Sequence, residues 1–227
     1  MVQKARSENK TLPPLFTICT DFQSAGRGMG SNKWFSECGK NILTSIYFEL
    51  NIPAARQFVF NQYFSLCTRA FICQFVDDVQ IKWPNDIYVS GKKIAGDLTE
   101  HTLSGDKLKH TIAGVGININ QDNFPEEIPH PTSLFLETGK TYSVEALLEQ
   151  YWQMLSDNLP LLEAPERLRQ EYLENLYQKD EEHAYIIKGV HTDAIIRGID
   201  EFGRLILEDK TGQNHICGYK EVVFLTD

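Results

Sequence analysis

The first half of the chain carries apolar patterns of two kinds. Residues 15–20 alternate weakly between apolar and polar side chains, and residues 41–50 are rich in β-branched and aromatic side chains. Each segment therefore predicts a strand. From residue 54 to residue 75 the apolar positions recur at close to helical spacing, and Pro53 suits the first turn of a helix. We therefore expect two strands followed by a long buried helix.

Short strands surround a proline turn in the middle of the chain. Residues 79–83 and 87–89 flank a Pro-Asn-Asp sequence, Ser90 and Gly91 predict a hairpin turn, and residues 93–100 form the returning strand. A further strand is expected over residues 108–119, whose Ala-Gly-Val-Gly sequence indicates close approach of the backbone to another group.

The next segment changes to loop and then to helix. Residues 121–132 are rich in proline and acidic side chains and predict a loop. Ser143 is a favourable N-cap for a helix over residues 144–158, and a second amphipathic helix is expected over residues 165–177.

The last part of the chain contains short strands at close spacing, punctuated by glycines. They predict a small β-barrel after a boundary near residues 178–182, so that residues 1–180 form one domain and residues 181–227 a second. We expect an α+β fold with a mixed sheet flanked by helices. The short strands are residues 185–188, 194–199, 205–207 and 222–225.

Composition excludes several classes of protein. No apolar stretch approaches the ~20 residues of a membrane helix, and the polar N-terminus has no secretory h-region. Five cysteines without a C-x-x-C pair favour a reducing, cytoplasmic compartment, and the six histidines show no metal-ligand spacing, so no protein metal site is expected. The net charge of −9 disfavours nucleic-acid binding.

The residues that carry chemistry lie in two segments. Residues 23–34 combine three glycines with Arg27 and Trp34, and glycine lets backbone N–H groups approach phosphate or carboxylate oxygens. Residues 82–86 (Lys-Trp-Pro-Asn-Asp) present a carboxamide and a carboxylate from a rigid turn, and Lys93 follows soon after. Together they indicate a site that makes an acyl-phosphate anhydride.

Five motifs in order resemble the catalytic and C-terminal domains of biotin protein ligases. They are Gln-x-x-Gly-Arg-Gly (23–28), Trp34, Lys-Trp-Pro-Asn-Asp (82–86), Lys-Ile-Ala-Gly (93–96) and Gly-Val-Gly-Ile-Asn (114–118). The resemblance implies a sheet-and-helix domain similar to class II aminoacyl-tRNA synthetases, followed by an SH3-like barrel, without an N-terminal DNA-binding domain. It also implies ATP and Mg²⁺ as cofactors, biotin as substrate and a biotin carboxyl carrier protein as partner, and it allows a homodimer.

The resemblance also implies residue roles. Lys93 would bridge the biotin carboxylate and the ATP α-phosphate, Arg27 would hold the same anions, and Asp86 would guide the proton of the incoming lysine amine. These three are the expected catalytic residues. Biotin would contact Gln23, Gly26, Arg27, Lys93, Gly96, Gly114 and Gly116, and the nucleotide would contact Gly28, Met29, Asn32, Trp34, Asn85 and Asn118.

Two departures from the family pattern keep other interpretations open. A Ser-Thr-Asn motif expected ahead of the glycine-rich segment would fall before Met1, and residues 7–9 are too close to replace it. Met29 and Asn32 stand where many relatives have arginines, which predicts weaker retention of the adenylate. A catalytically impaired biotin- or adenylate-binding remnant is therefore an alternative, and a lipoate-type ligase is a less favoured one.

Purely structural interpretations of single residues also remain open. Lys93 could be a solvated hairpin lysine, as we expect for Lys92, because strand alternation directs only one of the two inward. Asp86 could cap the turn, and Trp83 is expected to be structural.

Overall fold

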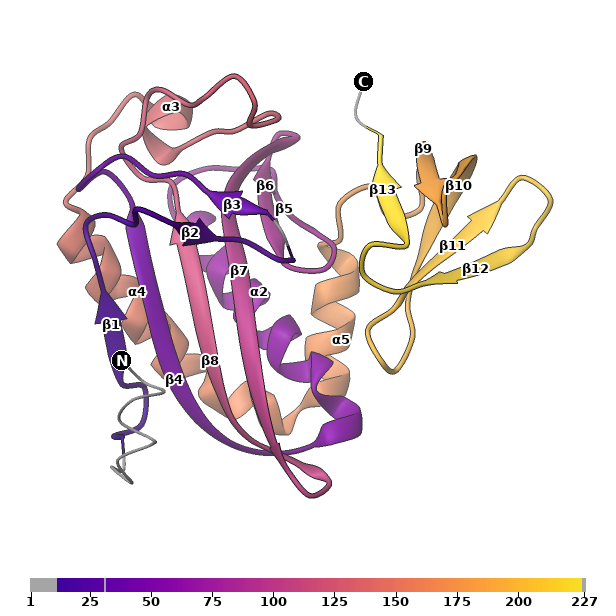
Figure 1. Cartoon of the computed structure of the whole chain (residues 1–227), viewed down its shortest axis with the longest axis horizontal. Helices are drawn as coiled ribbons and strands as arrows, with labels where there is room; N and C mark the ends of the chain where they lie inside the picture. Colours follow the sequence, from indigo (N-terminus) through magenta and orange to yellow (C-terminus); the bar gives the residue numbers. More distant parts are fainter. Residues whose placement is uncertain (1–11, 31, 226–227) are drawn as a thin grey trace.

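The larger part of the molecule is built on one six-stranded sheet (Figure 1). The structure is a computed structural model and describes residues 12–30 and 32–225. The strands lie in the order β1-β4-β8-β7-β6-β5, and each neighbouring pair is antiparallel. They are β1 (Thr17–Cys19), β4 (Ile42–Pro53), β5 (Val79–Lys82), β6 (Asp86–Val89), β7 (Lys92–Ser104) and β8 (Lys107–Ile117).

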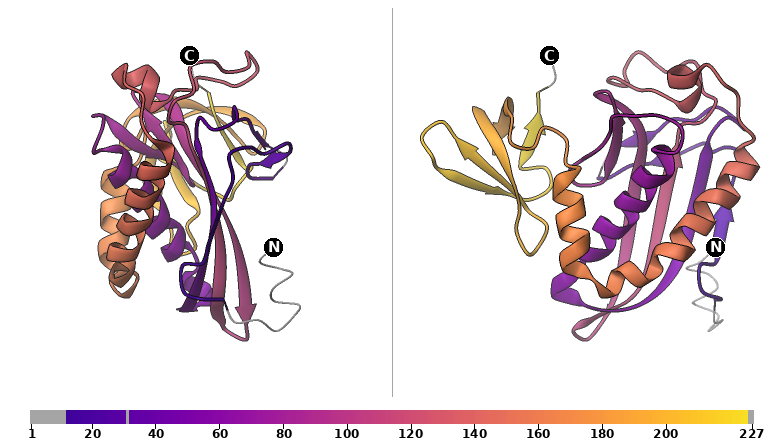
Figure 2. Two further views of the ribbon diagram at one scale, coloured as in Figure 1. Left: turned by 90° about the vertical axis from the view of Figure 1, so that its left-hand side faces the viewer. Right: turned by 180° about the vertical axis from the view of Figure 1, so that it is seen from behind.

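Helices cover one face of this sheet, and a small hairpin lies over the other (Figure 2, left). The hairpin pairs β2 (Gly26–Arg27) with β3 (Lys33–Trp34), so the glycine-rich segment lies across the uncovered face. The helical segments are η1 (Ala54–Arg56), α2 (Phe58–Ile72), α3 (Leu134–Thr138), α4 (Val144–Asn158), η2 (Leu159–Glu163) and α5 (Pro165–Glu174).

Helix α2 supplies much of the core between helices and sheet. Phe60 and Phe64 are fully buried and lie edge-on to Phe48 of β4, with ring centroids 4.9 and 6.0 Å away. Each such burial stabilises the fold by ~1.5–3 kcal/mol. Ser143 caps α4 by accepting a hydrogen bond from the Ala146 N–H, which fixes where that helix begins.

The C-terminal strands form a separate five-stranded sheet in the order β12-β11-β10-β9-β13. It lies beside α5 and is held there by hydrogen bonds (Figure 1). Trp83 Nε1 donates to Gly203 O at 2.9 Å, and Arg169 donates to Ile199 O at 2.7 Å. The strands are β9 (Glu182–Ile187), β10 (Val190–Ile199), β11 (Leu205–Asp209), β12 (Asn214–Cys217) and β13 (Val222–Phe224).

The expected α+β fold class is confirmed, but the large sheet is antiparallel throughout instead of mixed, and individual elements differ. The helix expected over residues 54–75 begins only at Phe58, because β4 continues through Pro53 and a 3₁₀ turn intervenes. Strand β12 and helix α3 were not predicted. Both are too short to show a period, and β12 contains only one β-branched residue, Ile216. Within the described residues, no helix has the length and apolar character needed to cross a membrane.

Candidate active site

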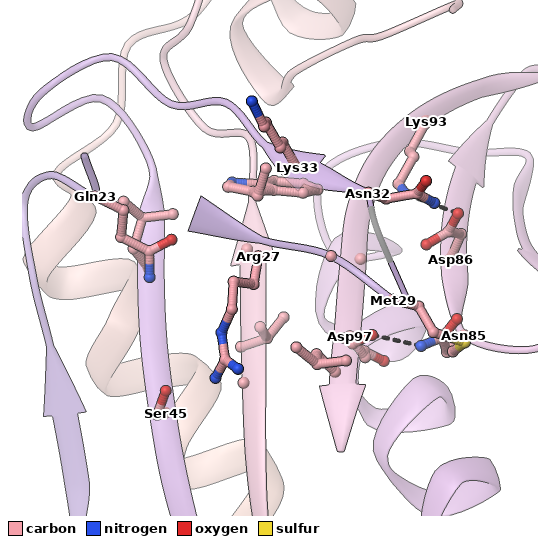
Figure 3. Close-up of a pocket in the computed structure, with 18 of the residues that line it drawn as sticks. Gln23, Arg27, Met29, Asn32, Lys33, Ser45, Asn85, Asp86, Lys93 and Asp97 are labelled. Atoms are coloured by element: carbon pink, nitrogen blue, oxygen red, sulfur yellow. Dashed lines mark hydrogen bonds and ion pairs between the residues drawn. The ribbon is translucent and has the colours of Figure 1, made fainter. Parts of the chain in front are cut away.

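A cavity of about 550 Å³ lies between the β2–β3 hairpin and the uncovered face of the sheet (Figure 3). This volume lies within the ~300–1,000 Å³ typical of small-molecule sites. Most of the predicted site residues line it, although they come from segments far apart in the chain. Those in the cavity wall are Gln23, Arg27, Gly28, Met29, Asn32, Trp34, Asn85, Asp86, Lys93, Gly96, Gly114 and Gly116.

Two predicted site residues, Gly26 and Asn118, are not among the residues that line the cavity. A Cβ on Gly26 would come within 2.4 Å of the Trp34 carbonyl oxygen and 2.9 Å of Gln23 Oε1, so glycine lets the hairpin close. Asn118 is buried and donates through Nδ2 to Thr132 O at 2.9 Å.

Lys93 points into the cavity and Lys92 does not. Lys93 Nζ lies 2.7 Å from Asp86 Oδ2 and 5.8 Å from the centre of the Trp34 ring, whereas Lys92 Nζ pairs with Glu137 at 2.7 Å. The solvated-lysine interpretation is therefore wrong for Lys93, which has a charged partner in the cavity.

An irregularity in strand pairing sets the direction of Lys93. The register between β6 and β7 shifts between Ile87 and Tyr88, so that Ala95 pairs with Ile87 but Lys93 pairs with Tyr88. A β-bulge of this kind can re-aim a side chain. As a result a Cβ on Gly96 would lie 3.3 Å from Lys93 Nζ, although strict alternation would place residues 93 and 96 on opposite faces.

Hydrogen bonds on several sides hold the Pro-Asn-Asp turn. Asn85 donates through Nδ2 to Asp97 O, and the Asp97 N–H donates to Asn85 O at 3.2 Å. Tyr172 of α5 donates to Pro84 O at 2.9 Å. These contacts fix Asn85 and so orient the neighbouring Asp86.

Trp34 lies directly on Gly116. A Cβ at residue 116 would come within 2.4 Å of Trp34 Cε2 and 2.7 Å of Trp34 Nε1, so only glycine leaves room for the indole at this point. This contact explains the close backbone approach predicted for the Ala-Gly-Val-Gly sequence.

Arg27 lies at the open side of the cavity. Its guanidinium pairs with Glu100 at 3.1 Å, and the arginine side chain is 75% exposed. An exposed pair of this kind stabilises the fold by only ~0–1 kcal/mol, so an anionic ligand can displace Glu100.

Two buried polar atoms of predicted site residues have no partner within the described part of the chain. They are Trp34 Nε1, a donor, and Asn118 Oδ1, an acceptor. Buried polar groups are nearly always hydrogen-bonded, so these atoms indicate where a bound molecule or water would be accommodated.

Sequence reasoning missed Asp97, which lies in the cavity wall directly after the Lys-Ile-Ala-Gly motif. It is buried and accepts a hydrogen bond from Ser65 Oγ at 3.2 Å and one from Thr68 Oγ1 at 3.5 Å. Burial raises the pKa of Asp97 well above its usual range. The sequence around Asp97 contains no pattern that predicts burial of its carboxyl group.

Sequence reasoning also missed Tyr219, which reaches the cavity from the small C-terminal sheet. Its hydroxyl donates to Met29 O at 3.3 Å. Because 190 residues separate the two, no local pattern could have predicted this contact.

The lysine of the Lys-Trp-Pro-Asn-Asp segment lies among aromatic rings. Lys82 Nζ lies 4.8 Å from the centre of the Tyr88 ring and 4.9 Å from that of Phe224, and it donates to Tyr88 Oη at 3.1 Å. Burial lowers the pKa of Lys82. Because Phe224 belongs to β13, this side chain helps to hold the small sheet against the larger one.

Comparisons with known proteins agree with this geometry. The bifunctional ligase/repressor BirA of Bacillus spizizenii is 34% identical over 140 residues, covering 58% of this chain and 42% of that protein. A biotin–acetyl-CoA-carboxylase ligase of Paracoccus denitrificans is 27% identical over 206 residues, covering 86% of this chain and 84% of that protein. The chain thus spans less than half the length of the Bacillus relative and most of the Paracoccus one.

A solved structure and a family profile extend the comparison. The structure of biotin protein ligase from Aquifex aeolicus in complex with biotin and ATP has a TM-score of 0.77 and 25% identity, covering 97% of this chain and 94% of that one. The biotin/lipoate A/B protein ligase family matches residues 3–118, which contain all five motifs. The chain is therefore a member of the biotin/lipoate A/B protein ligase family.

Proposed function

We propose that this chain is an ATP-dependent biotin–protein ligase. It joins biotin to ATP to form biotinyl-5′-AMP, and it then transfers biotin to a lysine of a biotin carboxyl carrier protein. In this proposal residues 1–180 form the catalytic domain and residues 181–227 the SH3-like domain. The observation that carries the proposal is the Lys93–Asp86 pair, 2.7 Å apart in a cavity closed by a glycine-rich hairpin.

The first half-reaction brings two anions together. A biotin carboxylate oxygen attacks the α-phosphorus of ATP, a P–O bond forms, and the bond to the β-phosphate breaks to release pyrophosphate. Lys93 is suited to this step because an ammonium is a compact charge that can lie between the carboxylate and the α-phosphate. Arg27 would add a second positive charge after exchanging Glu100 for the ligand.

The second half-reaction uses the same residues. The carrier lysine amine attacks the acyl carbon of the adenylate, a C–N bond forms, and the C–O bond to AMP breaks. Asp86 would take the amine proton, because once Lys93 binds the acyl phosphate the Asp86 carboxylate loses its partner and becomes available as a base. Asn85 would keep Asp86 in place through its bond to the Asp97 backbone.

The donor atoms near Asp86 are compatible with Mg²⁺. Across the described residues, no group of three or more histidine, cysteine or acidic side chains is placed to hold a metal ion. Mg²⁺ does not require such a cage, because it usually binds one or two carboxylates together with substrate phosphates and water. When bound, it would neutralise part of the charge on the phosphates.

The remaining parts of the proposal concern partners and location. We expect a cytoplasmic protein, because its five cysteines include no C-x-x-C pair. We also expect no nucleic-acid binding, because the net charge is −9. A homodimer is compatible with the resemblance to biotin protein ligases. The reaction requires a carrier protein that presents an accessible lysine.

The test is biotin transfer to an apo carrier domain. The chain is mixed with ATP, Mg²⁺, biotin and the carrier, and the carrier mass is followed for the gain of one biotinyl group. Lys93→Ala is expected to lower the rate by about 10²–10⁴-fold, because it removes a charge from the reacting centre. Lys92→Ala is the matched control, since Lys92 is the adjacent lysine and pairs with Glu137 instead.

The outcomes distinguish the alternatives. Transfer that survives Lys93→Ala would overturn the role of Lys93. Binding of biotin or its adenylate without transfer by the unmodified chain would favour the impaired remnant. Transfer of lipoate or octanoate in place of biotin would favour a lipoate-type ligase.

A further inference from the structure

Asp97 borders the cavity, but its carboxyl group is bonded to helix α2 on the covered face of the sheet. The buried carboxyl lies 3.2 Å from Ser65 Oγ and 3.5 Å from Thr68 Oγ1. Thr68 in turn lies 2.9 Å from the hydroxyl of Tyr151 on α4. A chain of polar side chains therefore connects strand β7 with α2 and α4.

The backbone of Asp97 holds the turn that carries Asp86. Asn85 donates through Nδ2 to Asp97 O, and the Asp97 N–H donates to Asn85 O at 3.2 Å (Figure 3). Asn85 is buried, so water does not replace these bonds easily. One residue thus contacts α2 through its side chain and the Pro-Asn-Asp turn through its backbone. The position of Asp86 therefore depends on where α2 holds residue 97.

The polar network fits a protonated Asp97. Thr68 has one hydroxyl hydrogen, and Phe64 O at 2.9 Å is a nearer acceptor for it than Asp97 Oδ1. When Thr68 donates to Phe64 O, its oxygen can accept hydrogen bonds from the Tyr151 hydroxyl and from a proton on Asp97. Burial raises the pKa of Asp97, which favours this neutral form. An asparagine at this position would keep an acceptor for Ser65 and a donor for Thr68.

Lys93 is anchored by a different segment. The Lys93 N–H donates to His130 O at 2.7 Å, and the Lys93 carbonyl accepts a hydrogen bond from the Thr132 N–H at 2.8 Å. These partners belong to the loop between β8 and α3, not to α2. Loss of the network at Asp97 is therefore expected to displace Asp86 and to leave the backbone of Lys93 in place.

We propose that Asp97 is a positioning residue for the second half-reaction, because its side chain fixes the strand that holds Asn85 and Asp86. This inference rests on the proposed function, in which Asp86 takes the proton of the carrier amine and Lys93 assists formation of the adenylate. A displacement of a catalytic group by ~1 Å can lower a rate by ~10²-fold. Asp97 therefore affects the transfer of biotin more than the formation of the adenylate.

The test measures the two half-reactions separately on the full chain. Adenylate formation is followed as a burst of pyrophosphate without carrier, and transfer is followed from added biotinyl-5′-AMP to an apo carrier domain. Asp97→Leu removes the hydrogen bonds and is expected to lower kcat of transfer about 10–10²-fold, with adenylate formation and the KM for the carrier within about threefold. Asp97→Asn is expected to keep the wild-type transfer rate, because it retains both hydrogen bonds.

Thr99→Val is the matched control. Thr99 lies two residues further along β7 and donates through Oγ1 to Asn61 Oδ1 of α2 at 3.1 Å. The control therefore removes a hydrogen bond between the same strand and the same helix, away from the Pro-Asn-Asp turn, and should leave transfer unchanged. Ser65→Ala tests the network if Asp97→Leu does not fold. It should slow transfer about threefold without affecting adenylate formation, because only one hydrogen bond to Asp97 is lost.

The outcomes for this inference and for the proposed function differ. Undiminished transfer in Ser65→Ala, or in Asp97→Leu when it folds, overturns the inference and leaves the proposed function intact. Equal losses in both half-reactions with a lower melting temperature also overturn it, because they indicate a purely structural role. A loss in Asp97→Asn as large as that in Asp97→Leu overturns it as well, since the hydrogen bonds would then have no part in the effect. A wild-type chain that forms no adenylate and transfers no biotin overturns the proposed function and this inference together.

Discussion

The contact between Trp34 and Gly116 allows a quantitative test by adding one methyl group. In Gly116→Ala the new Cβ would lie 2.4 Å from Trp34 Cε2, 2.6 Å from Cζ2 and 2.7 Å from Nε1. Ordinary van der Waals contact begins near 3.4 Å, so the indole must move by about 1 Å. Gly116 is on the central strand β8 and pairs with both neighbouring strands, so the ring, not the backbone, will yield.

The expected loss of stability is small. Overpacking a well-packed core reduces stability by ~1–3 kcal/mol, but Trp34 borders the cavity and can shift into it. We therefore expect a loss of about 1 kcal/mol, which lowers the melting temperature of a chain of this size by ~2–4 °C. The displaced ring would occupy part of the cavity and would no longer make its own contact with a ligand. Because both effects weaken binding, biotin affinity should fall at least about tenfold.

Gly114→Ala is the matched control. It adds the same methyl group to the same strand, two residues away, but its nearest neighbour is Leu98 O at 3.5 Å, an ordinary contact. Fluorine NMR of 5-fluorotryptophan protein can follow the three tryptophans separately. Gly116→Ala should shift the Trp34 resonance, and Gly114→Ala should leave it nearly unchanged. Equal behaviour of the two variants would refute the placement of Trp34 on Gly116.

Three further variants test other parts of the structure. Burial raises the pKa of Asp97, so the folded protein keeps a proton that the unfolded chain has lost, and stability falls as pH rises from the unfolded towards the folded pKa. Asp97→Asn should thus increase the free energy of unfolding by ~1–3 kcal/mol at pH 8 and by less at pH 4, measured by chemical denaturation; a gain independent of pH would contradict this. Trp83→Phe removes the buried donor to Gly203 O and should lower stability by ~1–1.5 kcal/mol. Trp152→Phe loses a longer, part-buried hydrogen bond of 3.4 Å to Leu15 O and should have a smaller effect on the same denaturation curve. Met29→Arg adds a cation to the hairpin and should slow release of the adenylate severalfold in a filter-binding assay; unchanged release would show that this charge is not limiting.

Local sequence patterns were sufficient for much of the fold. Strand alternation, helical spacing and capping depend on neighbours a few residues apart, so the helix at Val144–Asn158 and its Ser143 cap could be predicted with their bounds. Elements shorter than one period, such as α3 and β12, left no such pattern.

The tertiary structure decided which of the candidate residues face one another. The sequence selected Lys93 over Lys92 only through the resemblance to a family; strand alternation alone could not, because the choice depends on a register shift between β6 and β7. It could not predict the burial of Asp97, which requires helix α2 to pack over the strand. It could not predict the contact between Tyr219 and Met29 either.

The sequence by itself identified the family through its five motifs. It also determined the turns and helix ends, because glycines, prolines and capping residues act on the backbone next to them. Only the tertiary structure decided how the cavity is completed. Tyr219 reaches Met29 because the small sheet is docked through Trp83 and Gly203, and such contacts arise from packing between segments far apart in the chain. Local interactions therefore determine the helices and strands, and long-range packing determines which side chains surround the cavity.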